Sequence, residues 1–120
     1  LTHSLLEELH FGVWEGLRFG EIEQKWPRLA GRWIKDPMTV RIPRAETFAS
    51  LRRRIRRFLA LTRNRFSKRN VLVVAHGGIL SAMVLELLGL PDKEFAKHLQ
   101  PAGSIRTIQG EILSRIHPIC

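Results

Sequence analysis

The stretch Val71-Leu72-Val73-Val74-Ala75-His76-Gly77-Gly78 decides the fold that the sequence predicts. Its first five residues form an apolar, mostly β-branched run, which indicates a strand buried on both faces. The two glycines after the histidine permit a tight turn and a close approach of a ligand to the backbone. A helical pattern of apolar residues follows from Ile79, so the free N–H groups of that helix would face the end of the strand.

This order places His76 at the carboxyl end of a strand and at the N-terminus of a helix. Open α/β sheets bind ligands at that edge, and helix N-termini bind anions. The sequence therefore predicts a phosphate site at His76. The alternative is a structural histidine with satisfied hydrogen bonds and glycines that only form a turn, because the stretch lacks the spacing of a P-loop.

The rest of the chain adds mostly helices. Apolar residues at steps of three and four predict a helix over 47–66, with Thr47 or Glu46 at its N-terminus, and two short helices over 18–33 broken by Pro27. The other expected elements are a helix over 78–89, a short helix over 92–99, and a hairpin of strands at 104–109 and 112–117. The mixture indicates the α/β class.

The net charge of +9 is concentrated in one segment. Nine basic residues and no acidic residue lie between Leu51 and Arg69, and the remaining Lys and Arg balance the 11 Asp and Glu. One interpretation is a solvated helix face whose arginine stems cover apolar surface. The other is a basic interaction module, Arg52 to Arg69, that contacts the phosphate backbone of nucleic acid, although no recognised nucleic-acid motif accompanies it.

Several classes of protein are excluded by composition. The apolar fraction of 44% is that of a globular protein. No apolar run is long enough to span a membrane, and no signal peptide is visible. The single cysteine, Cys120, excludes an internal disulfide, and the histidines show no metal-ligand spacing. We expect a cytoplasmic protein without metal or cofactor, and its oligomeric state stays open.

Four segments together resemble the histidine phosphatase superfamily, which has the phosphoglycerate mutase-like fold. Their order and spacing match that family: 6–17 (LEELHFGVWEGL), 33–37 (WIKDP), 43–47 (PRAET) and 74–80 (VAHGGIL). The Trp-Glu-Gly form of the first segment is similar to the phosphatase branch, which includes α-ribazole phosphatase-like enzymes. The resemblance implies a phosphatase or mutase that transfers a phosphoryl group of a small phosphorylated substrate through a phosphohistidine.

The resemblance also implies roles for particular residues. Glu8 would correspond to the acid that protonates the leaving oxygen, and His76 to the second active-site histidine, which contacts the phosphoryl group. The backbone N–H of Gly77 would be a further phosphate donor. Arg44 and Glu46 lie where the family has its Gly-Gly-Glu-Ser loop, so they are candidate substrate-loop residues. Such a site suits phosphoryl transfer, which needs charge stabilisation and positioning.

One part of the family pattern is missing from these residues. The nucleophile of the family is the histidine of an Arg-His-Gly motif on the first strand, and this sequence contains no Arg-His-Gly. We therefore expect residues 1–120 to be the C-terminal part of one histidine phosphatase-like domain, a three-layer α/β sandwich lacking its N-terminal strand and helices. The complete chain would hydrolyse phosphomonoesters, and this portion alone would be inactive. The alternatives are a catalytically dead remnant that binds phosphate or a partner, and the basic interaction module.

Overall fold

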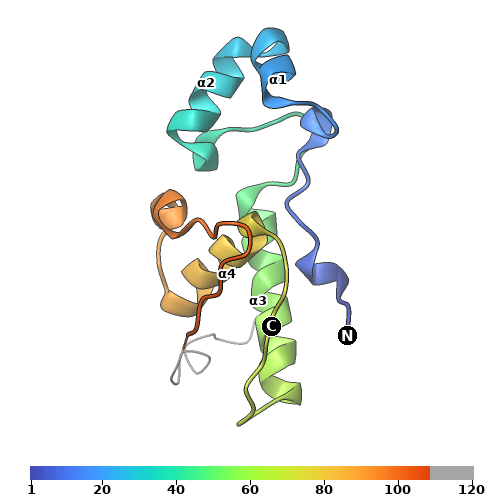
Figure 1. Cartoon of the computed structure of the whole chain (residues 1–120), viewed down its shortest axis with the longest axis vertical. Helices are drawn as coiled ribbons and strands as arrows, with labels where there is room; N and C mark the ends of the chain where they lie inside the picture. The colour runs from blue at the N-terminus through green and yellow to red at the C-terminus, as the bar shows by residue number, and fades with distance from the viewer. Residues whose placement is uncertain (109–120) are drawn as a thin grey trace.

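The computed structural model describes residues 1–108, and the cartoon in Figure 1 shows an elongated molecule of about 50 × 25 × 25 Å. All the regular secondary structure in these residues is helical. The α-helices are α1 (Phe19–Lys25), α2 (Pro27–Lys35), α3 (Phe48–Arg65) and α4 (Gly77–Leu88). Short 3₁₀ helices are η1 (Ser4–Leu6), η2 (Gly12–Trp14), η3 (Pro37–Thr39) and η4 (Asp92–His98).

Helix α3 confirms the helix predicted over residues 47–66. Thr47 caps it, since its hydroxyl oxygen accepts a hydrogen bond from the Ser50 N–H at 3.1 Å. One face of α3 is buried, and its residues recur at helical spacing: Leu51, Ile55, Phe58 and Leu59. This stripe is the surface on which the second long helix packs.

Helix α4 crosses α3 and forms with it the unit called here the helix pair (Figure 1). It is apolar on nearly all sides, and its buried residues run from Ile79 through Leu85 with one half-buried exception, Leu80. Gly89 ends it in a left-handed conformation with φ +67°, which glycine adopts at little cost. Phe95 of η4 packs against the same core, and its ring meets that of Phe48 edge-on at 5.2 Å.

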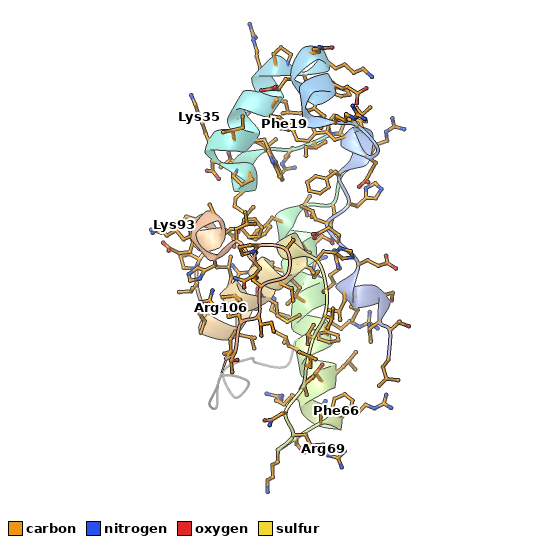
Figure 2. All side chains as sticks on the ribbon, in the orientation of Figure 1. Phe19, Lys35, Phe66, Arg69, Lys93 and Arg106 are labelled. Atoms are coloured by element: carbon orange, nitrogen blue, oxygen red, sulfur yellow. The ribbon has the colours of Figure 1, made fainter. Side chains whose placement is uncertain are left out.

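Residues 11–45 form a second cluster, called here the aromatic unit, at one end of the molecule (Figure 1). Pro27 begins α2 one residue after α1 ends, which confirms the predicted break. The ring of Trp33 meets the rings of Trp14 and Phe11 edge-on, at 5.7 and 5.6 Å between centroids. Figure 2 shows Phe19 and Lys35 at this end of the molecule, and Phe66 and Arg69 at the opposite end beyond α3.

The predicted strand over residues 71–75 is wrong for the part of the chain that the structure describes. Val73 and Ala75 pack against the core of the helix pair, whereas Leu72 and Val74 are 82% and 83% exposed. The segment thus has one buried side rather than two. A strand needs a neighbour to pair its backbone groups, and residues 1–108 contain no strand to serve as that neighbour.

The expected three-layer α/β sandwich is accordingly not observed within residues 1–108, which form helices and connecting segments alone. The predicted hairpin is also wrong in its described part, because residues 104–108 do not form a strand. Its turn and its second strand, at 112–117, lie outside the described residues.

Candidate active site

The candidate site lies at the N-terminus of α4, where His76 is the N-cap residue. The backbone there is non-helical, and the helix begins with Gly77, so the position predicted for His76 at a helix N-terminus is confirmed. The His76 side chain is exposed to solvent. An exposed imidazole beside the positive end of a helix is available to a bound anion.

Glu8 reaches this helix from a segment 70 residues away in the sequence. Its two carboxylate oxygens accept hydrogen bonds from the backbone N–H groups of Gly78 and Ile79, both at 3.0 Å. A third bond comes from the N–H of Leu9, at 2.9 Å. The Glu8 carboxyl group is therefore bound at a helix N-terminus, and the structure brings together the two residues to which the resemblance assigned catalytic roles.

The two glycines after His76 are needed because other parts of the chain approach closely. A Cβ atom on Gly78 would lie 2.7 Å from a carboxylate oxygen of Glu8, and one on Gly77 would lie 2.9 Å from the carbonyl oxygen of Gln100. The contact at Gly77 is with backbone and leaves no room for a side chain, whereas a Cβ at Gly78 would push the end of the Glu8 side chain away from the helix. The glycine pair therefore admits Glu8 to the helix and lets the segment around Gln100 pass beside it.

Ser81 fixes that second segment, and sequence reasoning missed it. It is fully buried in α4, and its hydroxyl donates to the carbonyl oxygen of Gly77 at 2.6 Å. The hydroxyl oxygen of Ser81 in turn accepts a hydrogen bond from the backbone N–H of Gln100 at 2.9 Å. A serine at the fifth position after His76 was the available signal, but only the fold shows which segment it binds.

The loop that carries Arg44 and Glu46 closes against residues 10–13. The N–H of Glu46 donates to the carbonyl oxygen of His10 at 2.9 Å, and the N–H of Val13 donates to that of Pro43 at 3.1 Å. Arg44 is exposed and has φ +60°, a left-handed conformation that glycine adopts more readily. The loop thus takes a glycine-like path at Arg44, although the two glycines common in the family are absent here.

Arg54 binds the side chain of Glu46 and is a second residue that sequence reasoning missed. Its guanidinium makes a two-pronged ion pair with the Glu46 carboxylate, at 2.8 and 2.9 Å. The carboxylate of this candidate substrate-loop residue is therefore engaged within the chain. In the sequence, Arg54 is one arginine among many on a basic helix, which gives no sign that it differs from its neighbours.

The arginines of α3 divide into two groups by their contacts. Arg52 forms ion pairs with Glu86 and Asp92, and the Arg56 Nε lies 3.8 Å from the Glu86 carboxylate. Burial opposes the charge of Arg52, but the hydrogen bonds and attraction of these two carboxylates raise its pKa above its ordinary value. Arg52 therefore joins the helix pair, whereas the Arg56 side chain is 41% exposed and also lines the groove described next.

Arg53 and Arg57 belong to the other group. Both are exposed, and they border a groove of about 440 Å³ on α3, which Arg54, Arg56, Leu5 and Leu61 also line. Neither His76 nor Glu8 lines this groove. Within residues 1–108, no three His, Cys, Asp or Glu side chains cluster in a way that could hold a metal ion, and no helix there is long and apolar enough to cross a membrane.

Comparisons with known proteins give the family. The family model of the histidine phosphatase superfamily (branch 1) matches residues 1–111. Phosphoserine phosphatase 1 of Hydrogenobacter thermophilus is 33% identical over 88 residues, which cover 73% of this chain and 42% of that protein. The adenosylcobalamin/alpha-ribazole phosphatase of Escherichia coli is 30% identical over 86 residues, 72% of this chain and 42% of that protein.

Solved structures also match this chain. Bacillus stearothermophilus YhfR matches with a TM-score of 0.72 and 26% identity, over 78% of this chain and 46% of that chain. Mycobacterial glucosyl-3-phosphoglycerate phosphatase Rv2419c matches with a TM-score of 0.67 and 27% identity, over 79% and 48% of the two chains. The chain thus spans less than half the length of these relatives. With the family model matching nearly its whole length, the chain belongs to the histidine phosphatase superfamily, branch 1.

Proposed function

We propose that this chain is the C-terminal portion of a phosphomonoesterase that hydrolyses small phosphorylated substrates through a phosphohistidine. The observation that carries the proposal is the meeting of Glu8 and His76 at the N-terminus of α4. The family and the phosphatase names of the relatives support it. The nucleophilic histidine would come from an Arg-His-Gly strand that residues 1–120 do not contain.

In this proposal each residue at the N-terminus of α4 has one role. The imidazole of His76 and the N–H of Gly77 bind the oxygens of the transferred phosphoryl group, whose negative charge the helix N-terminus favours. As the nucleophile forms its bond to phosphorus, the ester P–O bond breaks, and Glu8, which enters this step in its protonated form, gives that proton to the leaving oxygen. Water then attacks the phosphohistidine as the P–N bond breaks, and the water gives a proton to the Glu8 carboxylate, so that phosphate leaves and both the imidazole and the protonated Glu8 are regenerated.

The test is phosphatase activity of the complete protein, which includes the N-terminal residues, on p-nitrophenyl phosphate and phosphoserine. His76→Ala and Glu8→Gln should each lower kcat by about 10²–10⁴-fold, the usual contribution of a positioned acid or base. Arg65→Met, on the exposed end of α3, should leave kcat unchanged. Full activity in both site variants would refute the assignment.

A catalytically dead remnant is the first alternative, and the same protein distinguishes it. If the complete protein binds inorganic phosphate in a manner that depends on His76 but shows no turnover, the site has kept binding and lost chemistry. The isolated 120-residue chain should show no turnover under either interpretation, because it lacks the nucleophile.

Binding of a polyanion along α3 is the second candidate function. The groove bordered by Arg53 and Arg57 favours it, since neither arginine has an ion-pair partner among residues 1–108. Single-stranded RNA is the probe to titrate, at several salt concentrations. Binding that weakens steeply with salt and is lost in the double variant Arg53→Gln/Arg57→Gln would support this function.

A further inference from the structure

Arg54 uses all of its hydrogen-bond donors inside the chain. A guanidinium has five N–H groups, and five acceptors surround this one. Two are the carboxylate oxygens of Glu46, and the other three are the backbone carbonyl oxygens of Leu5, Glu7 and Glu8, at 2.8, 2.7 and 3.3 Å. The side chain of Arg54 is only 17% exposed, so these bonds are largely shielded from water.

Glu8 is consequently held at two points. Its backbone carbonyl accepts a hydrogen bond from Arg54 on α3, and its carboxylate accepts bonds from the start of α4. The backbone between Leu5 and Glu8 must lie in the right place for one short side chain to reach both N–H groups of α4. A functional group is held in productive geometry only when its supporting contacts fix it to within about 0.5 Å.

We propose that Arg54 is a positioning residue, which places Glu8 over the N-terminus of α4 and thereby sets the geometry of the active site. This inference rests on the proposed function, since it assigns Arg54 to the same site. Arg54 acts through Glu8 and does not touch the substrate. Glu46 supplies the charge that balances and orients its guanidinium.

The geometry requires arginine at this position. The planar guanidinium presents its donors as a rigid fork, so it can grip a carboxylate with two bonds and still reach three carbonyl oxygens on another segment. A lysine has three donors on one nitrogen and cannot reach acceptors on both sides. The variant Arg54→Lys therefore keeps the charge and most of the stem while removing the bridge between Glu46 and the Leu5–Glu8 backbone.

The first test uses the 120-residue chain and needs no activity. The amide proton chemical shifts of Gly78 and Ile79 report the Glu8 carboxylate, and Glu8→Ala gives their values without it. In Arg54→Lys both shifts should move most of the way toward the Glu8→Ala values. Arg65→Lys, the same exchange at an exposed position on the same helix, should leave them in place.

The second test uses the complete protein. Arg54→Lys should lower kcat by about 10²-fold, the usual effect of a misplaced catalytic group, while KM stays within about twofold. Added guanidinium ion should restore part of kcat to Arg54→Ala, because it can refill the vacated site. A residue that only stabilised the fold would lower the amount of active protein and would not respond to guanidinium.

The two tests separate the possible failures. If the wild-type complete protein shows no turnover, the proposed function fails, and the amide shifts still decide whether Arg54 positions Glu8. If Arg54→Lys is folded and keeps wild-type shifts at Gly78 and Ile79, the inference is overturned. Should Arg54→Lys not fold, Glu46→Gln replaces it: a shift of the same two amides supports the inference, and unchanged shifts overturn it.

Discussion

The aromatic unit and the helix pair are built from contacts of different range. The aromatic unit lies within residues 11–45, and its edge contacts of Trp33 with Trp14 and Phe11 join residues 19 and 22 positions apart. The helix pair is joined by contacts such as Arg52 with Glu86 and Glu8 with Ile79, which are 34 and 71 residues apart. The candidate site lies in the region of long-range contacts.

The difference in contact range indicates that the candidate site depends on contacts between distant segments. A cluster of aromatic rings can assemble within one continuous segment. Glu8 reaches the N-terminus of α4 only because two segments that are distant in the sequence pack together. The hydrogen bonds of Glu8, Arg54 and Ser81 join these distant segments. We therefore expect changes in the aromatic unit to act locally, and changes in the helix pair to disturb the site.

The largest losses of stability should come from replacing one large buried side chain in each core by alanine. Trp14→Ala should cost about 3–5 kcal/mol and Leu85→Ala about 2–5 kcal/mol, because both side chains are buried at 4% exposure or less. Amide hydrogen exchange should show Trp14→Ala lowering protection mainly in α1 and α2, and Leu85→Ala mainly in α3 and α4. Equal loss of protection in both regions would show that the two cores unfold as one.

The ion pairs of the helix pair should give the next largest effect. Glu86→Gln should lower the free energy of unfolding by about 1–3 kcal/mol, since the Glu86 side chain is 8% exposed and its loss leaves the Arg52 charge partly unpaired. Asp92→Asn should cost less than about 1 kcal/mol, because Asp92 is 52% exposed. Urea denaturation of both variants measures the difference, and equal costs would contradict the assigned burial.

Gly78→Ala tests the close approach of Glu8 to α4. The new methyl group would meet the carboxylate oxygen at 2.7 Å, so the variant should be destabilised by about 1–3 kcal/mol. In the Glu8→Ala background the same change should cost much less, because the clash is gone. Gly20→Ala, in α1 with open space around it, should instead stabilise by about 0.4–1 kcal/mol. Additive costs for Glu8 and Gly78 would show that they do not touch.

The smallest effect is expected in the segment between the two long helices. Val74→Thr should change the free energy of unfolding of the 120-residue chain by less than about 0.5 kcal/mol, because Val74 is 83% exposed. Thermal unfolding with and without the variant is sufficient to check it. A large loss would mean that Val74 is buried in solution, as the predicted strand would require.

The sequence predicted the helices well because their signals are local. The apolar stripe of α3 with Thr47 as its cap, the break at Pro27 and the stop at Gly89 each depend on residues within a few positions of one another. The strand prediction was wrong because a strand depends on residues that are distant in the sequence. The composition of residues 71–75 favours a strand, but a strand exists only with a neighbour, and residues 1–108 supply none.

The features of the candidate site also differ in whether they depend on adjacent or on distant residues. The sequence by itself determined the chemistry available at His76, Gly77 and Gly78, and that a helix N-terminus follows them, since these properties belong to adjacent residues. Only the tertiary structure decided that Glu8 lies over that helix, that Arg54 differs from the arginines around it, and that Ser81 holds Gln100. Hydrogen bonds between distant segments depend on where the packed helices bring the backbone, which residue spacing along the chain does not specify.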